Sequence, residues 1–210
     1  MSRTQNRQRN AGGVKRFPEL EPGINLVKGG SEVVESLISR TLYSRGGECV
    51  WIDSANNART GFISSEGLDR EVKVARAFTA HQHLSLVEKA EAETGDKTSI
   101  LALPSMNYLY EKPEIADYEK EEMFSQTVAK IAEISKRLEI PAVVTPSDGN
   151  LNWVMEAVAS QIIEVQNTSQ GYRVKSDSFV PEAYPDGKAF QTTVSHWVEK
   201  EPEVVKIGAN

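Results

Sequence analysis

Residues 72–86 read VKVARAFTAHQHLSL, and the interpretation of the whole chain starts from this stretch. A short apolar segment comes first, followed by a small polar turn and the start of a helix. The apolar residues are typical of a strand buried between helices, and they are Val72, Val74, Ala75, Ala77 and Phe78. Thr79 is a suitable N-cap. The residues that follow it at helical spacing are His81, Leu84, Val87 and Ala90.

Short apolar runs alternate with helical patterns on both sides of this stretch. Buried strands are predicted at 24–27, 49–52, 99–103, 142–145 and 161–165. Helices are predicted from Ser31, as N-cap, to the pair Gly46-Gly47, and at 66–70, 117–138 and 152–158. The segments 172–175 and 190–194 resemble antiparallel strands. This order predicts a three-layer α/β sandwich with a mostly parallel central sheet and antiparallel C-terminal strands.

The 210 residues carry a net charge of −6, which is unevenly distributed. Residues 1–16 contain five basic residues and no acid, and without them 19 basic residues face 30 acids, a net charge of −11. The acidic bulk argues against a broad nucleic-acid platform, because affinity for phosphates comes mostly from neutralised charge. We expect a solvated, disordered leader at 1–16, with weak DNA contact as the open alternative. Its basic residues are Arg3, Arg7, Arg9, Lys15 and Arg16.

One domain is expected, because a chain of this length with 39% hydrophobic residues can bury a substantial core. We place the core at 17–200 and a C-terminal tail at 201–210. No apolar run approaches the roughly 18 residues that a membrane span requires, and no apolar segment of a secretory signal follows the N-terminus. The one cysteine, Cys49, begins an apolar run, so we expect a buried thiol in a cytoplasmic protein without membrane association.

The run ARAFTAHQ, residues 75–82, resembles the ARA-[FY]-N-[ST]-x-HQ signature of the archaeal RadA recombinases and their eukaryotic relatives. From about Gly23 to Val198 the order of elements is similar to the RecA/RadA ATPase core. The segments VWIDS, SILALPSMNYLY and IPAVVTPSD fall where that core has strands that carry motifs. The resemblance implies a RecA-like fold of the P-loop NTPase type and suggests an archaeal source. The signature residues are Ala75, Arg76, Ala77, Phe78, His81 and Gln82.

The phosphate-binding loop of that family, GxxxxGK[ST], is degenerate in this chain. The matching segment, 27–36, reads VKGGSEVVES and has no GK[ST]. What remains of the loop is Gly29, Gly30 and Ser31. This turn is too short to surround a triphosphate, and Glu32 and Glu35 in the following helix would repel a polyanion. We therefore expect that no nucleotide cofactor is bound.

Three other positions that carry chemistry in the family are altered. Ala55 stands where a catalytic Glu would activate water, and alanine cannot act as a general base. Pro104 ends the strand that should carry a magnesium-associated Asp, and Pro146-Ser147 replaces the Asn-Gln pair that senses the γ-phosphate. Phosphoryl transfer depends almost wholly on positioning and charge stabilisation. We therefore expect a pseudo-ATPase with no catalytic residues, no metal and no cofactor.

The other polar candidates have structural interpretations. Asp53 follows a strand, where ligands gather in open α/β folds, but a cap on the neighbouring loop is the favoured role. We expect Arg76 to form an internal pair or to support the edge of the sheet. His81 and His83 do not share a helix face, which argues against a metal site. An aromatic loop is a weaker candidate for stacking on DNA bases, with acids close by as the argument against it. Its residues are Asn107, Tyr108 and Tyr110, with Arg59 on the same rim.

By resemblance, such a chain is expected to be a non-catalytic paralogue that modulates DNA recombination or repair through protein contact. Its partner would be a RadA/RecA-like recombinase or another repair protein, because ATP in this fold commonly lies between subunits and a subunit without the chemistry can keep its docking surface. Two alternatives stay open. One is a residual DNA- or nucleotide-binding module that uses the arginine-rich leader. The other is an interaction or inhibitor protein outside repair, as in the cell-division inhibitors with a RecA-like fold but no P-loop.

Overall fold

The computed structural model describes residues 18–56, 58, 71–168, 171–178 and 203–205. The basic leader, the short helix expected at 66–70 and the strand expected at 190–194 lie outside these ranges. Within them, no helix is both long enough and apolar enough to cross a membrane.

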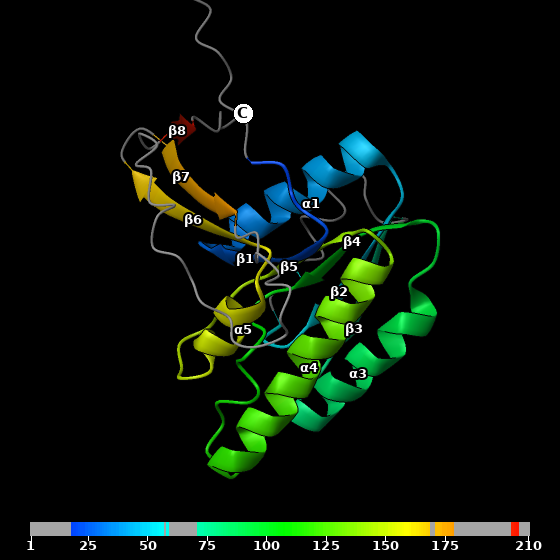
Figure 1. Ribbon diagram of the computed structural model, residues 1–210, viewed down its shortest axis with the longest axis vertical. Coiled ribbons are helices and arrows are strands. Elements are labelled where there is room, and N and C mark those ends of the chain that lie inside the picture. Colours follow the sequence, from blue (N-terminus) through cyan, green and yellow to red (C-terminus); the bar gives the residue numbers. More distant parts are fainter. Residues whose placement is uncertain (1–17, 57, 59–70, 169–170, 179–202, 206–210) are drawn as a thin grey trace, which may run out of the picture.

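One mixed β-sheet runs through the centre of the molecule (Figure 1). Its strands are β1 (Gly23–Lys28), β2 (Glu48–Asp53), β3 (Val72–Arg76), β4 (Thr98–Leu103), β5 (Pro141–Val144), β6 (Gln161–Thr168), β7 (Gly171–Ser178) and β8 (Glu203–Val205). The strand order is β3-β2-β4-β5-β1-β6-β7-β8. The strands from β3 to β6 in this order are parallel, and β7 and β8 run antiparallel to their neighbours. The predicted mostly parallel sheet with antiparallel C-terminal strands is confirmed.

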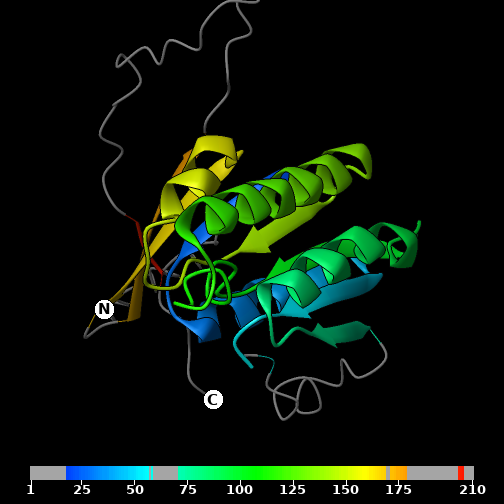
Figure 2. The ribbon, with the colours of Figure 1, turned by 90° about the horizontal axis from the view of Figure 1, so that it is seen from below.

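Helices cover both faces of the sheet, as Figures 1 and 2 show. One face carries α1 (Ser31–Arg45), and the opposite face carries α3 (Ala80–Glu93), α4 (Asp117–Arg137) and α5 (Asn152–Val158). α3 and α4 pack side by side (Figure 2). The arrangement is a three-layer α/β sandwich, and the helix predicted at 152–158 has the observed bounds.

Two separate cores lie above and below the sheet, and the inner strands contribute to both. Along β4, Leu101 and Leu103 point into the core under α3, α4 and α5, whereas Ile100 and Ala102 point into the core under α1. Burial on both faces explains why these strands read as continuous apolar runs. Cys49 is fully buried in the core under α1, and this burial raises the pKa of its thiol, so the predicted buried thiol is confirmed.

The stretch 72–86 forms the expected strand, turn and helix, but two expected details are wrong. β3 is the edge strand of the sheet rather than a strand buried between helices, and Val74 is 39% exposed. Its apolar residues do not reveal this, because the strand order depends on contacts distant in sequence. His81 does not belong to the buried helix face either. The buried residues of α3 are Ala80, His83, Val87 and Ala90.

Two further expectations differ from the structure. Ser31 is the first residue of α1 rather than its N-cap, because Gly30 holds the extended N-cap conformation with φ −70° and ψ 163°. No side chain caps this helix. β8 pairs with β7 inside the segment expected to be a tail. A strand of three residues is too short to give a periodic signal.

Candidate functional site

The carboxyl ends of the parallel strands meet at one edge of the sheet, where ligands gather in open α/β folds. β2, β4, β5 and β1 are consecutive neighbours in the sheet. The strand order therefore places side by side the four segments that the resemblance matches to chemical motifs. These segments follow β1, β2, β4 and β5.

The connection from β1 to α1 consists of Gly29 and Gly30 alone. A Cβ added at Gly29 would lie 3.0 Å from Cβ of Val165 on β6, so close packing on the neighbouring strand explains this glycine. The amide of Val33 donates a hydrogen bond of 3.1 Å to the carbonyl of Gly30, which starts the helix at once. The connection is as short as the sequence predicts. Two residues cannot form a loop whose amides surround a triphosphate.

Two charged side chains near this turn are withdrawn from solvent to different degrees, one by an ion pair and one by burial. Nζ of Lys28 lies 2.8 Å from Oε1 of Glu156 on α5, in an ion pair. Glu35 is buried in α1, with 7% of its surface exposed. The side chain of Glu32 lies outside the described part of the structure, so its expected repulsion of phosphate stays a prediction.

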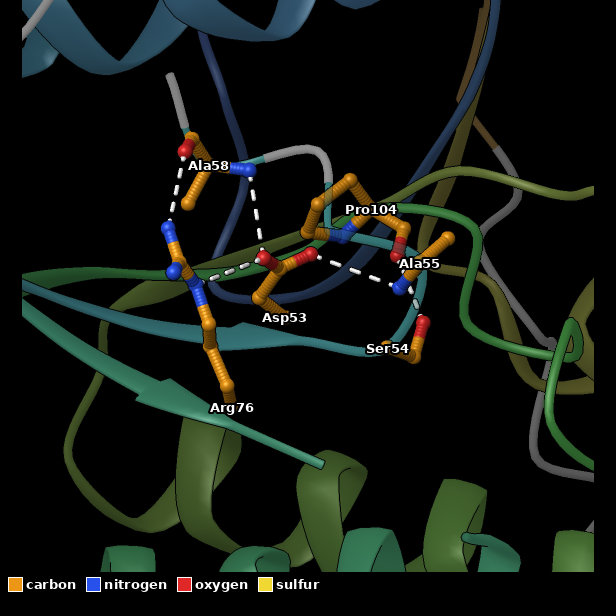
Figure 3. A network of polar contacts seen from close by, with 6 residues as sticks. All are labelled: Asp53, Ser54, Ala55, Ala58, Arg76 and Pro104. Atoms are coloured by element: carbon orange, nitrogen blue, oxygen red, sulfur yellow. Dashed lines mark hydrogen bonds and ion pairs between the residues drawn. The ribbon is translucent and has the colours of Figure 1, made fainter. Parts of the chain in front are cut away.

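Asp53, at the end of β2, is fully buried and surrounded by donors (Figure 3). Its Oδ2 lies 3.4 Å from Nε of Arg76 on β3 and accepts a hydrogen bond of 3.3 Å from the amide of Ala58. Its Oδ1 accepts one of 3.4 Å from the amide of Ala55. Arg76 also donates to the carbonyl of Ala58, at 3.2 Å. A buried carboxylate requires such partners. The loop cap predicted for Asp53 and the internal pair predicted for Arg76 are both confirmed.

The end of β2 is also tied to the turn that follows β4. Oγ of Ser54 lies 3.0 Å from the carbonyl oxygen of Pro104 and 2.8 Å from that of Ser105 (Figure 3 includes the first contact). Ser105 has a positive φ of 51°, and its amide donates a hydrogen bond of 2.8 Å to Oγ1 of Thr145. Where the family places a magnesium-associated Asp, this chain therefore has backbone carbonyls that accept from a serine.

The loops after β4 and β5 are fastened to each other by side chains 40 residues apart in the sequence. Asn107 is fully buried, and its Oδ1 accepts a hydrogen bond of 2.7 Å from the amide of Ser147. Oε1 of Glu111 accepts one of 2.9 Å from the amide of Leu151. Gly149 has a φ of +151°, and a Cβ there would lie 2.2 Å from the carboxyl carbon of Glu111. No local pattern in the sequence indicates these contacts.

The turn between β3 and α3 resembles a capping box. Oγ1 of Thr79 accepts a hydrogen bond of 3.2 Å from the amide of Gln82, which confirms Thr79 as the N-cap. Oε1 of Gln82 accepts one of 3.0 Å from the amide of Phe78, one residue before the N-cap. Of the remaining signature residues, Ala77 is buried and Ala75 is half-buried. The side chains of Thr79 and Gln82 therefore fix the start of α3.

His83, just after the signature, is fully buried and joins α3 to α4 through a chain of hydrogen bonds. Its Nδ1 lies 2.9 Å from the hydroxyl of Tyr110, which lies 2.8 Å from Oγ1 of Thr127. Because Thr127 donates to the carbonyl of Met123, Tyr110 donates to Thr127 and His83 donates from Nδ1. Burial lowers the pKa of His83 to about 4 and raises the pKa of Tyr110. Both side chains are therefore neutral at neutral pH.

The two histidines lie on different sides of α3, as predicted. His81 is exposed, and its Nε2 lies 3.6 Å from Oε1 of Glu119 on α4. Among the residues that the structure describes, no three His, Cys, Asp or Glu side chains converge on a site for a metal ion.

The aromatic loop does not form the base-stacking surface considered from the sequence. Asn107 and Tyr110 are both fully buried, so neither can stack on a base. Tyr108 is partly exposed, and Nζ of Lys112 lies 4.0 Å from the centroid of its ring. Arg59 and the basic residues of the leader lie outside the described ranges.

Among the described residues at the carboxyl edge, the side chains of Asp53, Ser54, Asn107 and Glu111 bind one another's loops or nearby side chains. The carboxylate of Asp53 is neutralised by Arg76, and the hydroxyl of Ser54 donates to a carbonyl. This edge is therefore held together as a scaffold by its own polar groups. A comparison with protein-family models and with curated proteins finds no match to this chain.

Proposed function

We propose that this chain is a RecA-like protein of the RadA type that has lost ATP hydrolysis and acts as an accessory subunit in DNA recombination or repair. Two observations support the RecA-like part of the proposal. The residues 75–82 resemble the RadA signature. The strand order brings together, at one edge of the sheet, the four segments that match the positions of the family's motifs. The partner would be a RadA/RecA-like recombinase, in the cytoplasm of an archaeal cell.

The observation that carries the loss of ATPase chemistry is the two-residue connection between β1 and α1. A phosphate loop needs enough backbone to wrap the phosphates and a lysine that follows the glycines. Here Lys28 precedes the glycines and is paired with Glu156. A triphosphate over Gly29 and Gly30 would have to compete with that ion pair and would lack a surrounding loop.

The remaining groups at the edge support the same conclusion. Ala55 offers no carboxylate to activate water, and its amide is already bonded to Asp53. Asp53 itself is neutralised by Arg76 and capped by backbone amides, so it is not placed to hold a magnesium ion. Because phosphoryl transfer is mostly positioning and charge stabilisation, the loss of these groups removes the means of catalysis.

Contact with a protein rather than with DNA follows from the charge. Outside the leader the chain is strongly acidic, and neutralised phosphates supply most of the affinity for nucleic acid. A subunit that keeps the fold but lacks the catalytic residues can still bind beside a catalytic subunit.

The first test measures ATP binding and hydrolysis by the purified chain with magnesium. We expect no saturable binding of a fluorescent ATP analogue at up to millimolar concentration, and no turnover above that of buffer. Lys28→Ala and Lys73→Ala form a matched pair, because each removes a lysine from an ion pair, with Glu156 and Glu48 respectively. Turnover that is abolished by Lys28→Ala and kept by Lys73→Ala would contradict the proposal.

The second test measures association with a purified RadA-type recombinase by size-exclusion chromatography and follows strand exchange. We expect a complex whose formation does not require ATP on this chain, and an altered rate of strand exchange. If no complex forms, and DNA binding instead depends on salt and disappears on deletion of residues 1–16, the leader-based DNA-binding alternative replaces the proposal.

A further inference from the structure

Two exposed aromatic side chains lie at the N-terminal ends of α3 and α4, Phe78 just before α3 and Tyr118 in the first turn of α4. Tyr118 and Phe78 are 79% and 76% exposed, the highest values among the large hydrophobic side chains in the described part of the chain. The contact between His81 and Glu119, at 3.6 Å, joins the first turns of the two helices beside them. Figure 2 shows the two helices side by side on one face of the sheet.

Neither ring contributes to the core beneath it. An apolar residue just before an N-cap often packs against the fourth helical residue as a hydrophobic staple. Here Phe78 precedes the N-cap Thr79 and the fourth helical residue is His83, which is fully buried without it. In α4, the first buried residue is Met123, well past Tyr118. Exposed aromatic side chains that do not pack against the core commonly mark sites of protein contact.

The rings are accompanied by a concentration of negative charge. The segment 117–122 contains four acids and one lysine. The helix dipole explains acids in the first turn, which holds Asp117 and Glu119, but not the exposed Glu121 and Glu122 in the second. We name this patch the acidic–aromatic surface, and it comprises Phe78, Asp117, Tyr118, Glu119, Glu121 and Glu122.

We propose that the acidic–aromatic surface docks a partner protein that presents lysine and arginine side chains around an apolar pocket. The negative charge of this surface favours a basic protein over two other binding partners. Nucleic acid is disfavoured because its phosphates would face carboxylates. A second copy of this chain, bound through the same patch, is disfavoured because a two-fold interface would set acids against acids. The two aromatic side chains then act as anchors, and the carboxylates set orientation and association rate.

This inference rests on the proposed function only in assuming a protein partner, and it holds whether or not that partner is a recombinase. The test uses the full chain with the photo-crosslinker p-benzoylphenylalanine at position 78, 118 or 43, in native lysate. Position 43 is the control, because Tyr43 is 68% exposed but lies on α1, on the opposite face. We expect one protein to be captured from positions 78 and 118 and not from 43, through a lysine- and arginine-rich segment.

The captured protein is then purified, and its affinity for the variants is measured by biolayer interferometry. We expect Phe78→Ala and Tyr118→Ala each to weaken binding at least tenfold, Glu121→Gln/Glu122→Gln to slow association and reduce its salt dependence, and Tyr43→Ala to bind as wild type. Unchanged thermal unfolding confirms that the variants fold. The proposed docking surface is contradicted by equal capture from position 43, by capture of this chain itself or by no capture. It is also contradicted if Phe78→Ala and Tyr118→Ala bind the partner with unchanged affinity. A partner that is not a repair protein overturns the proposed function alone.

Discussion

The two β–α connections at the carboxyl edge of the sheet differ in what their side chains do. Between β3 and α3, Thr79 caps the helix, Gln82 binds the amide of Phe78, and Arg76 neutralises Asp53. Between β1 and α1 there are only two glycines, and no side chain caps the helix. The resemblance to RadA is kept in the first connection and lost in the second.

This difference separates residues that hold the fold from residues that perform chemistry. The signature residues Arg76 and Gln82 make polar contacts to neighbouring parts of the chain, so they have a structural role in the scaffold. The connection between β1 and α1 makes no comparable side-chain contacts, since it consists of two glycines. A short signature that supports the fold is therefore weak support for activity, and the following variants test whether its roles are structural.

The largest expected effect concerns His83, next to the signature. Its pKa is lowered from 6.5 to about 4 by burial, so the folded state keeps the ring neutral while the unfolded chain binds a proton between these values. Stability is therefore full above about pH 6.5 and is lost as the pH falls toward 4, by up to about 3 kcal/mol from this one group. Urea unfolding at several pH values measures the loss.

His83→Gln should reduce the slope of stability against pH in that window, since the amide does not titrate. His81→Gln is the matched control, because His81 is exposed two residues earlier in the same helix. Equal slopes in wild type and His83→Gln would show that the buried ring is not what links stability to pH.

The next effect tests the pair between Asp53 and Arg76. Arg76→Ala leaves a fully buried carboxylate without its cation and should destabilise the protein by about 2 kcal/mol. This is less than for a fully buried pair, because the side chain of Arg76 is 41% exposed and Asp53 keeps its amide donors. Chemical denaturation measures the change in the free energy of unfolding.

Lys73→Ala, on the same strand, is the control for this pair. Lys73 forms an ion pair of 2.7 Å with Glu48, but both side chains are partly exposed and the pair is screened by solvent, so its loss should destabilise the protein much less than Arg76→Ala does. If the two variants lose the same stability, the signature arginine has no special structural role and the comparison between the two connections fails.

The parts of the fold that the sequence predicts are those with local signals. The helix at 152–158, the strand predicted at 49–52 and the cap at Thr79 each follow from periodicity or capping chemistry within a few residues. The edge position of β3 was missed, because it depends on which strand lies beside β2 across the whole sheet. The sequence predicts the N-cap of α1 one residue too late, at Ser31 instead of Gly30, because glycine has no side chain that signals a cap.

The candidate site shows the same division. The sequence predicts a loop cap for Asp53, because polar side chains gather at the carboxyl ends of strands, but it does not identify Arg76 as the partner of Asp53. The sequence does not predict the burial of Tyr110, because its partners His83 and Thr127 come from two helices distant in sequence. The bonds from Asn107 to Ser147 and from Glu111 to Leu151 were missed for the same reason.

The smallest effects compare the two helix starts directly. Thr79→Ala removes the side-chain cap of α3 and should destabilise the protein by about 1 kcal/mol. Gly30→Asp supplies a cap to α1, which has none, and should stabilise it by about 0.3 kcal/mol, since the extended backbone at Gly30 suits an aspartate and the dipole favours its charge. Both changes are measured by urea unfolding at pH 7. Opposite signs are required, because one variant removes a hydrogen bond that the fold uses and the other adds one where the fold has only glycine. A loss of stability in Gly30→Asp would mean that the β1–α1 connection does not tolerate a side chain at Gly30. The contrast between the two connections would then depend only on the ion pair of Lys28 with Glu156.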